Sequence, residues 1–124
     1  MYGVPADLDL SIFERATLIQ LAIGEFQVQF RFDSDGIISA EGKWELRNAN
    51  GEVVDEAEST ASPNANAERD AYRLHVILGK TVERYAIDPP HSFSLRFTTG
   101  HLLTVFDDSK QYESFQIQPG NIVV

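Results

Sequence analysis

The sequence predicts an α+β fold that is mostly antiparallel β, with two similar β-rich halves sharing one core. Each half is expected to contain a short helix followed by about five strands. Three observations predict this. Apolar and polar residues alternate along many short segments, turn residues separate those segments, and the second half repeats the pattern of the first. A chain of 124 residues is long enough for one domain with a sizeable core.

The clearest hairpin covers residues 93–106. From Phe93 onward, apolar residues alternate with polar ones, which is the period of a half-buried strand. Gly100 supplies the turn because glycine tolerates the positive φ that tight hairpins need. Residues 102–106 return as the second strand of the hairpin.

The first half begins with a short helical segment at residues 7–15, where Asp9 or Ser11 is expected to cap one or two turns. In the strand that follows, Ile19 and Ile23 are expected on one face of the alternation. The strands expected in this half cover residues 16–23, 26–32, 37–40, 43–47 and 53–54.

A polar linker is predicted at residues 55–66, which contain no large apolar residue. A helix is predicted at 67–78, because Ala67, Ala71, Leu74 and Leu78 form one helical stripe, which Gly79 ends. The strands expected in the second half cover residues 81–87, 93–98, 102–106, 112–118 and 122–124.

An internal repeat follows from matches between the two halves. The matched pairs are 17–23 with 81–87, 30–32 with 95–97, Gly36 with Gly100, and Trp44-Glu45 with Tyr112-Glu113. Similarity at a nearly fixed offset indicates two copies of one unit. We therefore expect residues 1–124 to form a single domain of two pseudo-repeats, about 8–54 and 67–124. The alternative is that two β-rich halves resemble each other by chance.

Several short motifs carry a family resemblance. They are Ile-Gly-Glu-Phe-Gln-Val-Gln-Phe (23–30), Glu-Gly-Lys-Trp-Glu (41–45), Leu-Gly-Lys-Thr-Val (78–82), Ser-Phe-Ser-Leu-Arg-Phe (92–97), Gly100, Asp-Asp-Ser (107–109) and Tyr-Glu-Ser-Phe (112–115). Through them the chain resembles a family of small uncharacterised bacterial domains. The resemblance implies a compact, mostly β, bacterial and cytoplasmic domain, and it brings no catalytic residues.

Composition and charge exclude several functions. The net charge is −9, whereas nucleic-acid binding requires a basic face. No apolar run approaches the roughly 20 residues of a membrane helix, and residues 1–7 lack the features of a signal peptide. The chain has no cysteine, which excludes disulfides and suits a reducing compartment. We therefore expect a cytoplasmic protein with neither a membrane nor a nucleic-acid partner.

The acidity is concentrated in the first half. Residues 1–62 carry 12 acidic and 4 basic residues, a net charge of −8. Residues 63–124 carry 7 acidic and 6 basic residues, a net charge of −1. Clustered carboxylates steer a protein toward basic partners, although they also serve solubility alone. The candidate partner-binding residues are Glu52, Asp55, Glu56, Glu58, Asp107 and Asp108.

The sequence contains no motif for catalysis, for a cofactor or for a metal. His75, His91 and His101 have no metal-ligand spacing, and Asp33 to Gly36 departs from a calcium loop because its glycine comes too early. We expect no enzyme but a non-catalytic binding protein, an immunity or antitoxin-like protein that neutralises a basic toxin through an acidic surface. One alternative is a structural or interaction module that forms a homodimer through an edge strand such as 122–124. A hydrolase using scattered carboxylates is a third.

Overall fold

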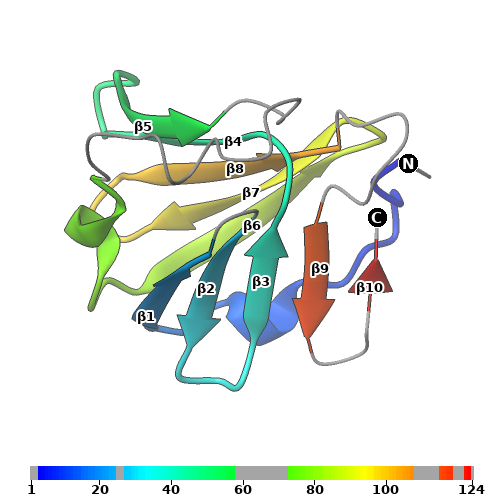
Figure 1. The fold of residues 1–124 in the computed structure, drawn as a ribbon, viewed down its shortest axis with the longest axis horizontal. Coiled ribbons are helices and arrows are strands. Elements are labelled where there is room, and N and C mark those ends of the chain that lie inside the picture. The colour runs from blue at the N-terminus through cyan, green and yellow to red at the C-terminus, as the bar shows by residue number, and fades with distance from the viewer. Residues whose placement is uncertain (1–2, 25–26, 58–72, 108–114, 119–121, 124) are drawn as a thin grey trace.

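The computed structural model describes residues 3–24, 27–57, 73–107, 115–118 and 122–123. This part of the chain is mostly antiparallel β, with ten strands in two five-stranded sheets and two short 3₁₀ helices (Figure 1). The strands of the two sheets run in clearly different directions, so the sheets cross (Figure 1). The prediction of a mostly antiparallel β protein is therefore confirmed.

The elements follow the predicted order along the chain. The first half contains η1 (Ser11–Phe13), β1 (Leu18–Ile23), β2 (Val28–Phe32), β3 (Ile37–Ala40), β4 (Trp44–Arg47) and β5 (Val53–Ala57). The second half contains η2 (Leu74–Ile77), β6 (Val82–Asp88), β7 (Ser92–Phe97), β8 (Leu102–Phe106), β9 (Phe115–Gln118) and β10 (Ile122–Val123). Each strand overlaps a segment that was expected to be a strand from its alternating apolar and polar residues.

The two sheets exchange hairpins between the halves of the chain. Sheet 1 has the order β1-β2-β3-β9-β10, and sheet 2 has the order β5-β4-β8-β7-β6. Thus β4 and β5 leave the sheet that contains β1 to β3, and β4 pairs with β8, while β9 pairs with β3 and β10 with β9. Each sheet consists of a three-stranded meander from one half and a hairpin from the other.

Backbone pairings recur at a fixed distance along the chain. Leu18 pairs with Phe32, and Val82, which is 64 residues after Leu18, pairs with Phe97. A register shift follows each pair, between Leu18 and Gln20 in β1 and at the corresponding step in β6. We call positions that have the same pairings in the two sheets equivalent positions.

The equivalent positions correct two matches predicted from the sequence. The Phe32 N–H donates to the Gly36 oxygen as the Phe97 N–H donates to the His101 oxygen. The equivalent of Gly100 is therefore Asp35, and both have a positive φ, 92° and 68°.

Trp44 was matched with Tyr112. The pairing instead makes Phe115 its equivalent, because Trp44 pairs with Val105 as Phe115 pairs with Ala40. Tyr112 itself lies outside the described residues. The predicted match was three residues out because both segments carry an aromatic residue and the connecting loops differ in length.

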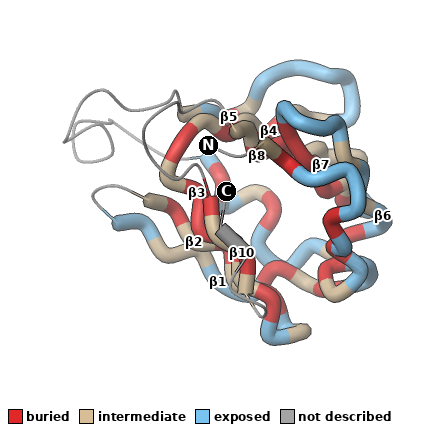
Figure 2. The backbone as a smooth tube through the Cα atoms, turned by 90° about the vertical axis from the view of Figure 1, so that its right-hand side faces the viewer, coloured by how far each residue is buried: buried red, intermediate tan, exposed pale blue. Residues whose placement is uncertain are grey.

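The core lies between the two sheets, where the backbone tube of Figure 2 is buried. Aromatic pairs cross it in edge-to-face contact. Phe30 of sheet 1 meets Trp44 of sheet 2 with ring centroids 6.4 Å apart, and Phe93 meets Phe115 at 4.9 Å. Such pairs contribute about 0.5–1.5 kcal/mol beyond the burial of their area. Each pair therefore joins the two sheets, although both of its rings come from the same half of the sequence.

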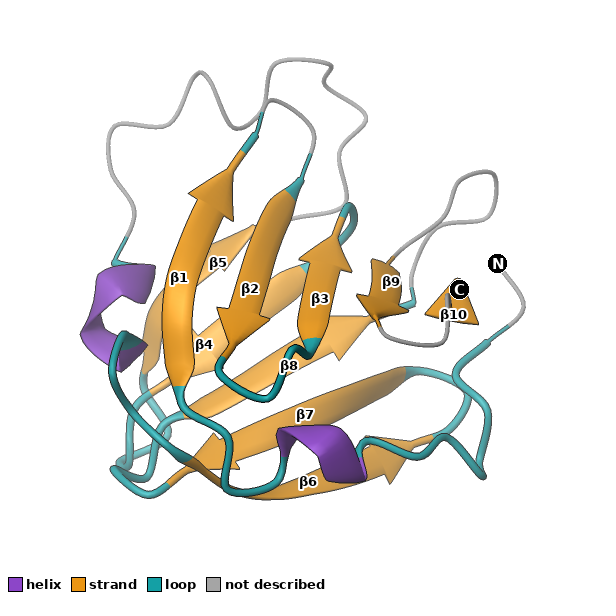
Figure 3. Ribbon diagram, turned by 90° about the horizontal axis from the view of Figure 1, so that it is seen from below, coloured by secondary structure: helices purple, strands orange, loops and turns teal. Residues whose placement is uncertain are grey.

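The short helices close the core at its sides. Helix η1 contacts β6, and η2 contacts β1, so each helix lies against the meander of the other half (Figure 3). The Ser11 N–H donates to the Asp9 carboxylate at 2.9 Å, so Asp9 accepts from the first residue of η1. No helix in the described part of the chain is long and apolar enough to cross a membrane.

The predicted helix at 67–78 is wrong in its described portion. Leu74 to Ile77 form a 3₁₀ turn, and Leu78 is already extended, with ψ 131°. A single 3₁₀ turn is enough to bury the apolar residues of this segment, because Leu74 and Ile77 at its two ends are both fully buried. Residues 67–72 lie outside the described residues.

The linker predicted at 55–66 is also wrong at its beginning, since 55–57 complete β5. Residues 58–66 lie outside the described part of the chain.

Candidate functional site

The six acidic residues predicted to bind a partner do not form one surface. Asp55 is buried, Asp107 is half-buried, and Glu52 and Glu56 are exposed. Glu58 and Asp108 lie outside the described residues. The described members of the set therefore divide into two pairs with different environments.

Asp55 supports the fold rather than a binding surface. It is 6% exposed, and its carboxylate accepts hydrogen bonds from the backbone N–H of Glu56 at 2.9 Å and of Arg73 at 2.7 Å. A buried carboxylate with backbone donors fixes the chain segments that supply them. The prediction that Asp55 faces a partner is corrected, because the alternation of β5 turns this side chain inward.

Asp107 also accepts a backbone hydrogen bond. Its Oδ2 accepts from the Gly3 N–H at 2.8 Å, and its own N–H donates to the His91 oxygen at 2.8 Å. These contacts tie the N-terminal segment to the end of β8. Its carboxylate is thus engaged within the fold and is a poor candidate for partner contact.

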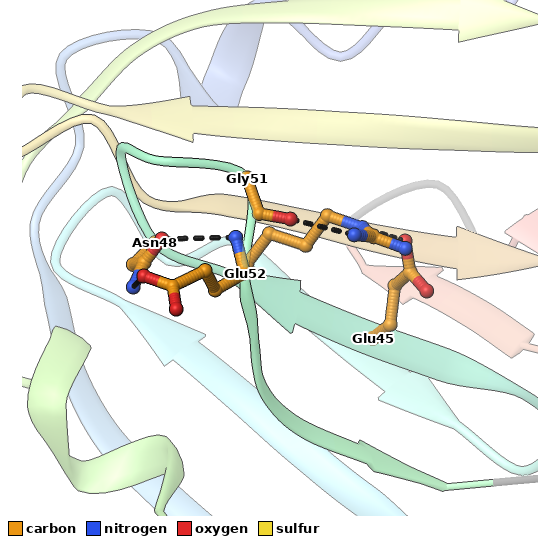
Figure 4. A network of polar contacts seen from close by, with 5 residues as sticks. Glu45, Asn48, Gly51 and Glu52 are labelled. Carbon is orange, nitrogen blue, oxygen red and sulfur yellow. Dashed lines mark hydrogen bonds and ion pairs between the residues drawn. The ribbon is translucent and has the colours of Figure 1, made fainter.

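The two exposed members of the predicted set, Glu52 and Glu56, lie on the hairpin formed by β4 and β5, at one edge of sheet 2. We call Glu45, Glu52 and Glu56 the acidic hairpin. Glu52 lies at its turn, where its Oε1 accepts from Asn48 Nδ2 at 3.2 Å and its N–H donates to Asn48 Oδ1 at 3.0 Å (Figure 4). Asn48 therefore holds the turn from both sides and fixes where Glu52 emerges.

Arg47 orients the carboxylate of Glu45, which lies near the open end of the hairpin. Its Nε donates to Glu45 Oε1 at 2.8 Å, and its Nη1 donates to the Gly51 oxygen at 2.6 Å (Figure 4). The hydrogen bond and charge of Glu45 raise the pKa of Arg47, and the charge of Glu56 adds to this effect. Arg47 thus orients Glu45 and offsets part of the local negative charge.

Glu45 and Glu56 are direct cross-strand neighbours. Like charges at such positions destabilise a sheet, by roughly 0.2–1 kcal/mol. Glu45 forms an ion pair with Arg47 at 2.8 Å and Glu56 is exposed to solvent, so the repulsion between the two carboxylates is screened. Charged side chains on an exposed edge strand hinder pairing with another chain, and they also attract basic groups.

The described residues contain no arrangement for metal binding. Within them, no three His, Cys, Asp or Glu side chains lie close enough together to hold a metal ion. His101 Nδ1 shares a hydrogen bond with Thr99 Oγ1 at 2.7 Å beside the hairpin turn, and His75 and His91 are exposed.

No family model, curated protein or solved structure matches this chain. The resemblance to a bacterial domain family stays an expectation from short motifs. The acidic hairpin is therefore interpreted from its own chemistry.

The candidate set drawn from the sequence missed Glu45. The available signal was the spacing of Glu45 and Arg47, two residues apart in a strand, which places both side chains on one face. The cross-strand position of Glu56 requires the register of β4 and β5, which the sequence does not reveal.

Proposed function

We propose that this protein is a non-catalytic, cytoplasmic binding protein of the immunity or antitoxin type, which holds a basic protein through the acidic hairpin. The observation that carries the proposal is the gathering of Glu45, Glu52 and Glu56 on one edge hairpin, two of them exposed. An acidic surface of this kind accelerates association with a basic toxin.

The rest of the chain supports the same choice. The net charge of −9 attracts basic partners over a distance set by ionic strength. A chain without cysteine suits a reducing compartment. The hairpin turn is held by Asn48 and Arg47, so its carboxylates are positioned before a partner arrives.

The test is a pull-down from source-cell lysate at about 50 mM and about 300 mM salt. The tested variant is Glu52→Gln/Glu56→Gln. The matched control is Glu14→Gln/Glu83→Gln, which removes two exposed carboxylates away from the acidic hairpin. The wild type and the control should retain one basic protein at low salt, and the hairpin variant should bind it several-fold to about tenfold more weakly.

Two results would contradict the proposal. One is retention of the same protein by the hairpin variant as well as by the control. The other is binding that does not weaken between the two salt concentrations, because exposed charge pairs are screened by salt.

A homodimeric interaction module is the second candidate. Its support is at the edges of sheet 1, where β10 lies at one edge and β1 at the other. On β1, Ile19 and Ile23 are 60% and 50% exposed, and apolar edge strands favour pairing with another chain. A sedimentation mass of twice 13.9 kDa that is independent of any basic protein would favour this candidate over the first.

We infer, in addition, that the chain consists of two copies of one unit whose terminal hairpins have been exchanged between the sheets. Equal pairings at offsets of 64 and 65 residues in both meanders support the inference. The matching positive φ of Arg15 and Gly79, 63° and 79°, supports it further. Such a unit could not bury its own sheet face alone.

A further inference from the structure

The outer face of sheet 2 carries a basic pair away from the acidic hairpin. Arg84 on β6 and Arg96 on β7 are direct cross-strand neighbours, and their side chains leave the core face, where Leu95 and Phe97 are buried. Among the described residues, no carboxylate forms an ion pair with either arginine. Two adjacent guanidinium groups repel each other unless an anion lies between them.

The equivalent positions in sheet 1 differ in a specific way. There, Gln20 pairs with Arg31, so that sheet has one arginine where sheet 2 has two. Arg31 Nη2 donates to Gln29 Oε1 at 3.2 Å, which gives its guanidinium a partner on its own strand. The equivalent of Gln29 is Ser94, whose side chain is too short to repeat this contact.

The short side chain leaves space beside the second arginine. A hollow of about 280 Å³ opens there, and it is lined by Arg84, Tyr85, Ala86, Ser94, Arg96 and Leu102. Its volume lies just below the range of about 300–1,000 Å³ that is usual for drug-sized ligands. The hollow therefore has room for a small group rather than for a nucleotide.

We propose that this hollow binds a small oxyanion, a carboxylate or phosphate group held between Arg84 and Arg96. Guanidinium groups match both oxyanions because their N–H donors form a planar fork. Ser94 adds a hydroxyl donor at the same site, and Ala86 and Leu102 are its small or apolar neighbours. Arg96 is partly fixed in advance, since its Nη1 donates to the Gly100 oxygen at 3.3 Å.

The oxyanion site and the exposed carboxylates of the acidic hairpin lie on different strands of sheet 2, although Arg47 on β4 pairs with Leu102, which lines the hollow. In sheet 2, β8 and β4 separate β7 from β5, so the basic pair and the exposed Glu56 lie on different sides of the central strand. Loss of one site should leave the other intact. Failure of the basic-partner proposal therefore does not decide the fate of the oxyanion proposal.

The test is a titration of the full chain with inorganic phosphate and, separately, with citrate, up to roughly 10 mM. Binding is followed by amide chemical shifts of residues 84–86 and 94–96. We expect saturable shifts confined to β6, β7 and β8. Saturation by phosphate but not citrate would assign a phosphate ligand, and the reverse would assign a carboxylate.

Two variants remove the site in different ways. Arg84→Gln installs the residue found at the equivalent position of sheet 1 and should weaken binding at least about tenfold, because one charged donor group is lost. Ser94→Gln keeps both arginines, but the longer side chain should fill the hollow and engage Arg96 as Gln29 engages Arg31. It should therefore weaken binding as well.

Arg31→Gln is the matched control, since it removes an exposed-face arginine of sheet 1 and changes the net charge equally. It should leave the titration unchanged. The proposal is overturned if neither anion gives saturable shifts, if Arg84→Gln binds like the wild type, or if Arg31→Gln loses affinity to the same extent as Arg84→Gln. Thermal unfolding of each variant verifies that the loss is not a loss of fold.

Discussion

Thr17 and Thr81 face each other where the edges of the two sheets meet, with their hydroxyl oxygens 3.1 Å apart. Around this pair the backbone forms a short ladder, in which the Arg15 N–H donates to the Val82 oxygen and the Val82 N–H to the Ala16 oxygen, both at 2.8 Å. The two threonines are equivalent positions, 64 residues apart. The contact is thus a join between the same place in the two meanders.

Replacing either threonine by valine should destabilise the protein by about 1 kcal/mol, because the other half-buried hydroxyl loses its partner. The double variant Thr17→Val/Thr81→Val should cost no more than one single variant, since no hydroxyl is then left unpaired. Urea unfolding of the four proteins gives the coupling between the two sites. Strictly additive costs would contradict a direct interaction between the hydroxyl groups.

Asp55→Asn should lower the free energy of unfolding more than the removal of an exposed carboxylate does, because Asp55 is buried. The amide side chain keeps the shape of the carboxylate but loses the charge that strengthens its hydrogen bonds with the N–H groups of Glu56 and Arg73. We expect a loss of about 1–3 kcal/mol in the free energy of unfolding. Glu56→Gln, one residue along, is the control, and its effect should stay within about 0.5 kcal/mol. Equal effects of the two changes would show that Asp55 is not a structural residue.

The strands could be predicted because their signal is local. In β2, Val28, Phe30 and Phe32 are buried and alternate with half-buried polar residues, as the sequence pattern requires. The exchange of hairpins between sheets could not be predicted, since pairing of β4 with β8 joins segments more than 50 residues apart. Alternation specifies which face is buried but not which strand lies beside it.

Local irregularities account for most of the remaining errors. The bulge after Leu18 shifts the alternation of β1 against β2, so Leu18 pairs with Phe32 and is buried, and the regular alternation expected through Ile19 is interrupted. Gly36 was matched with the turn residue Gly100, but a glycine is required there because of its contact with the core. A Cβ there would lie 2.5 Å from Phe13 Cε1. Neither bulges nor close contacts leave a periodic signal in the sequence.

The candidate site was predicted only in part for a similar reason. Composition identified an acidic first half, and Glu52 and Glu56 are exposed as a binding surface requires. The sequence does not distinguish these from Asp55, because a carboxylate that accepts backbone N–H groups has the same residue type as a solvated one. The oxyanion site was missed altogether, since Arg84 and Arg96 become neighbours only through the register of β6 and β7.

Gly79 and Gly100 both have a positive φ, but only Gly100 is also crowded by a neighbouring side chain. Gly79 has φ 79° with no atom within 4 Å of an added Cβ, whereas at Gly100, with φ 92°, an added Cβ would lie 2.6 Å from Ala49 Cβ. Gly79→Ala should therefore cost about 1–2 kcal/mol through its left-handed φ alone. Gly100→Ala should cost about 1–3 kcal/mol more, because it also overpacks the neighbouring turn.

The double variant Gly100→Ala/Ala49→Gly measures how much of the destabilisation comes from the contact with Ala49. It removes the methyl group of Ala49 and should return the cost to that of Gly79→Ala, as measured by urea unfolding. No recovery in this double variant would mean that the close approach is relieved by backbone movement and contributes nothing.

The segment before η1 should show a pH dependence that originates at Asp9. The hydrogen bond from the Ser11 backbone N–H, followed by one from its side chain, lowers the pKa of Asp9 below its ordinary value of 3.8. A group whose pKa is lower in the folded state stabilises the protein above its unfolded pKa, and that contribution is lost as the pH falls through the folded pKa. Asp9→Asn should therefore be less stable than the wild type near neutral pH, and the difference should shrink below about pH 4.

The measurement is urea unfolding of the wild type and Asp9→Asn at a series of pH values, together with the NMR titration of the Asp9 carboxyl. Ser11→Ala is the control, because it removes the hydroxyl but retains the backbone N–H that contributes most. The pKa of Asp9 should remain lowered in that variant. A stability difference that is constant with pH, or that grows on acidification, would show that the carboxylate does not cap this turn.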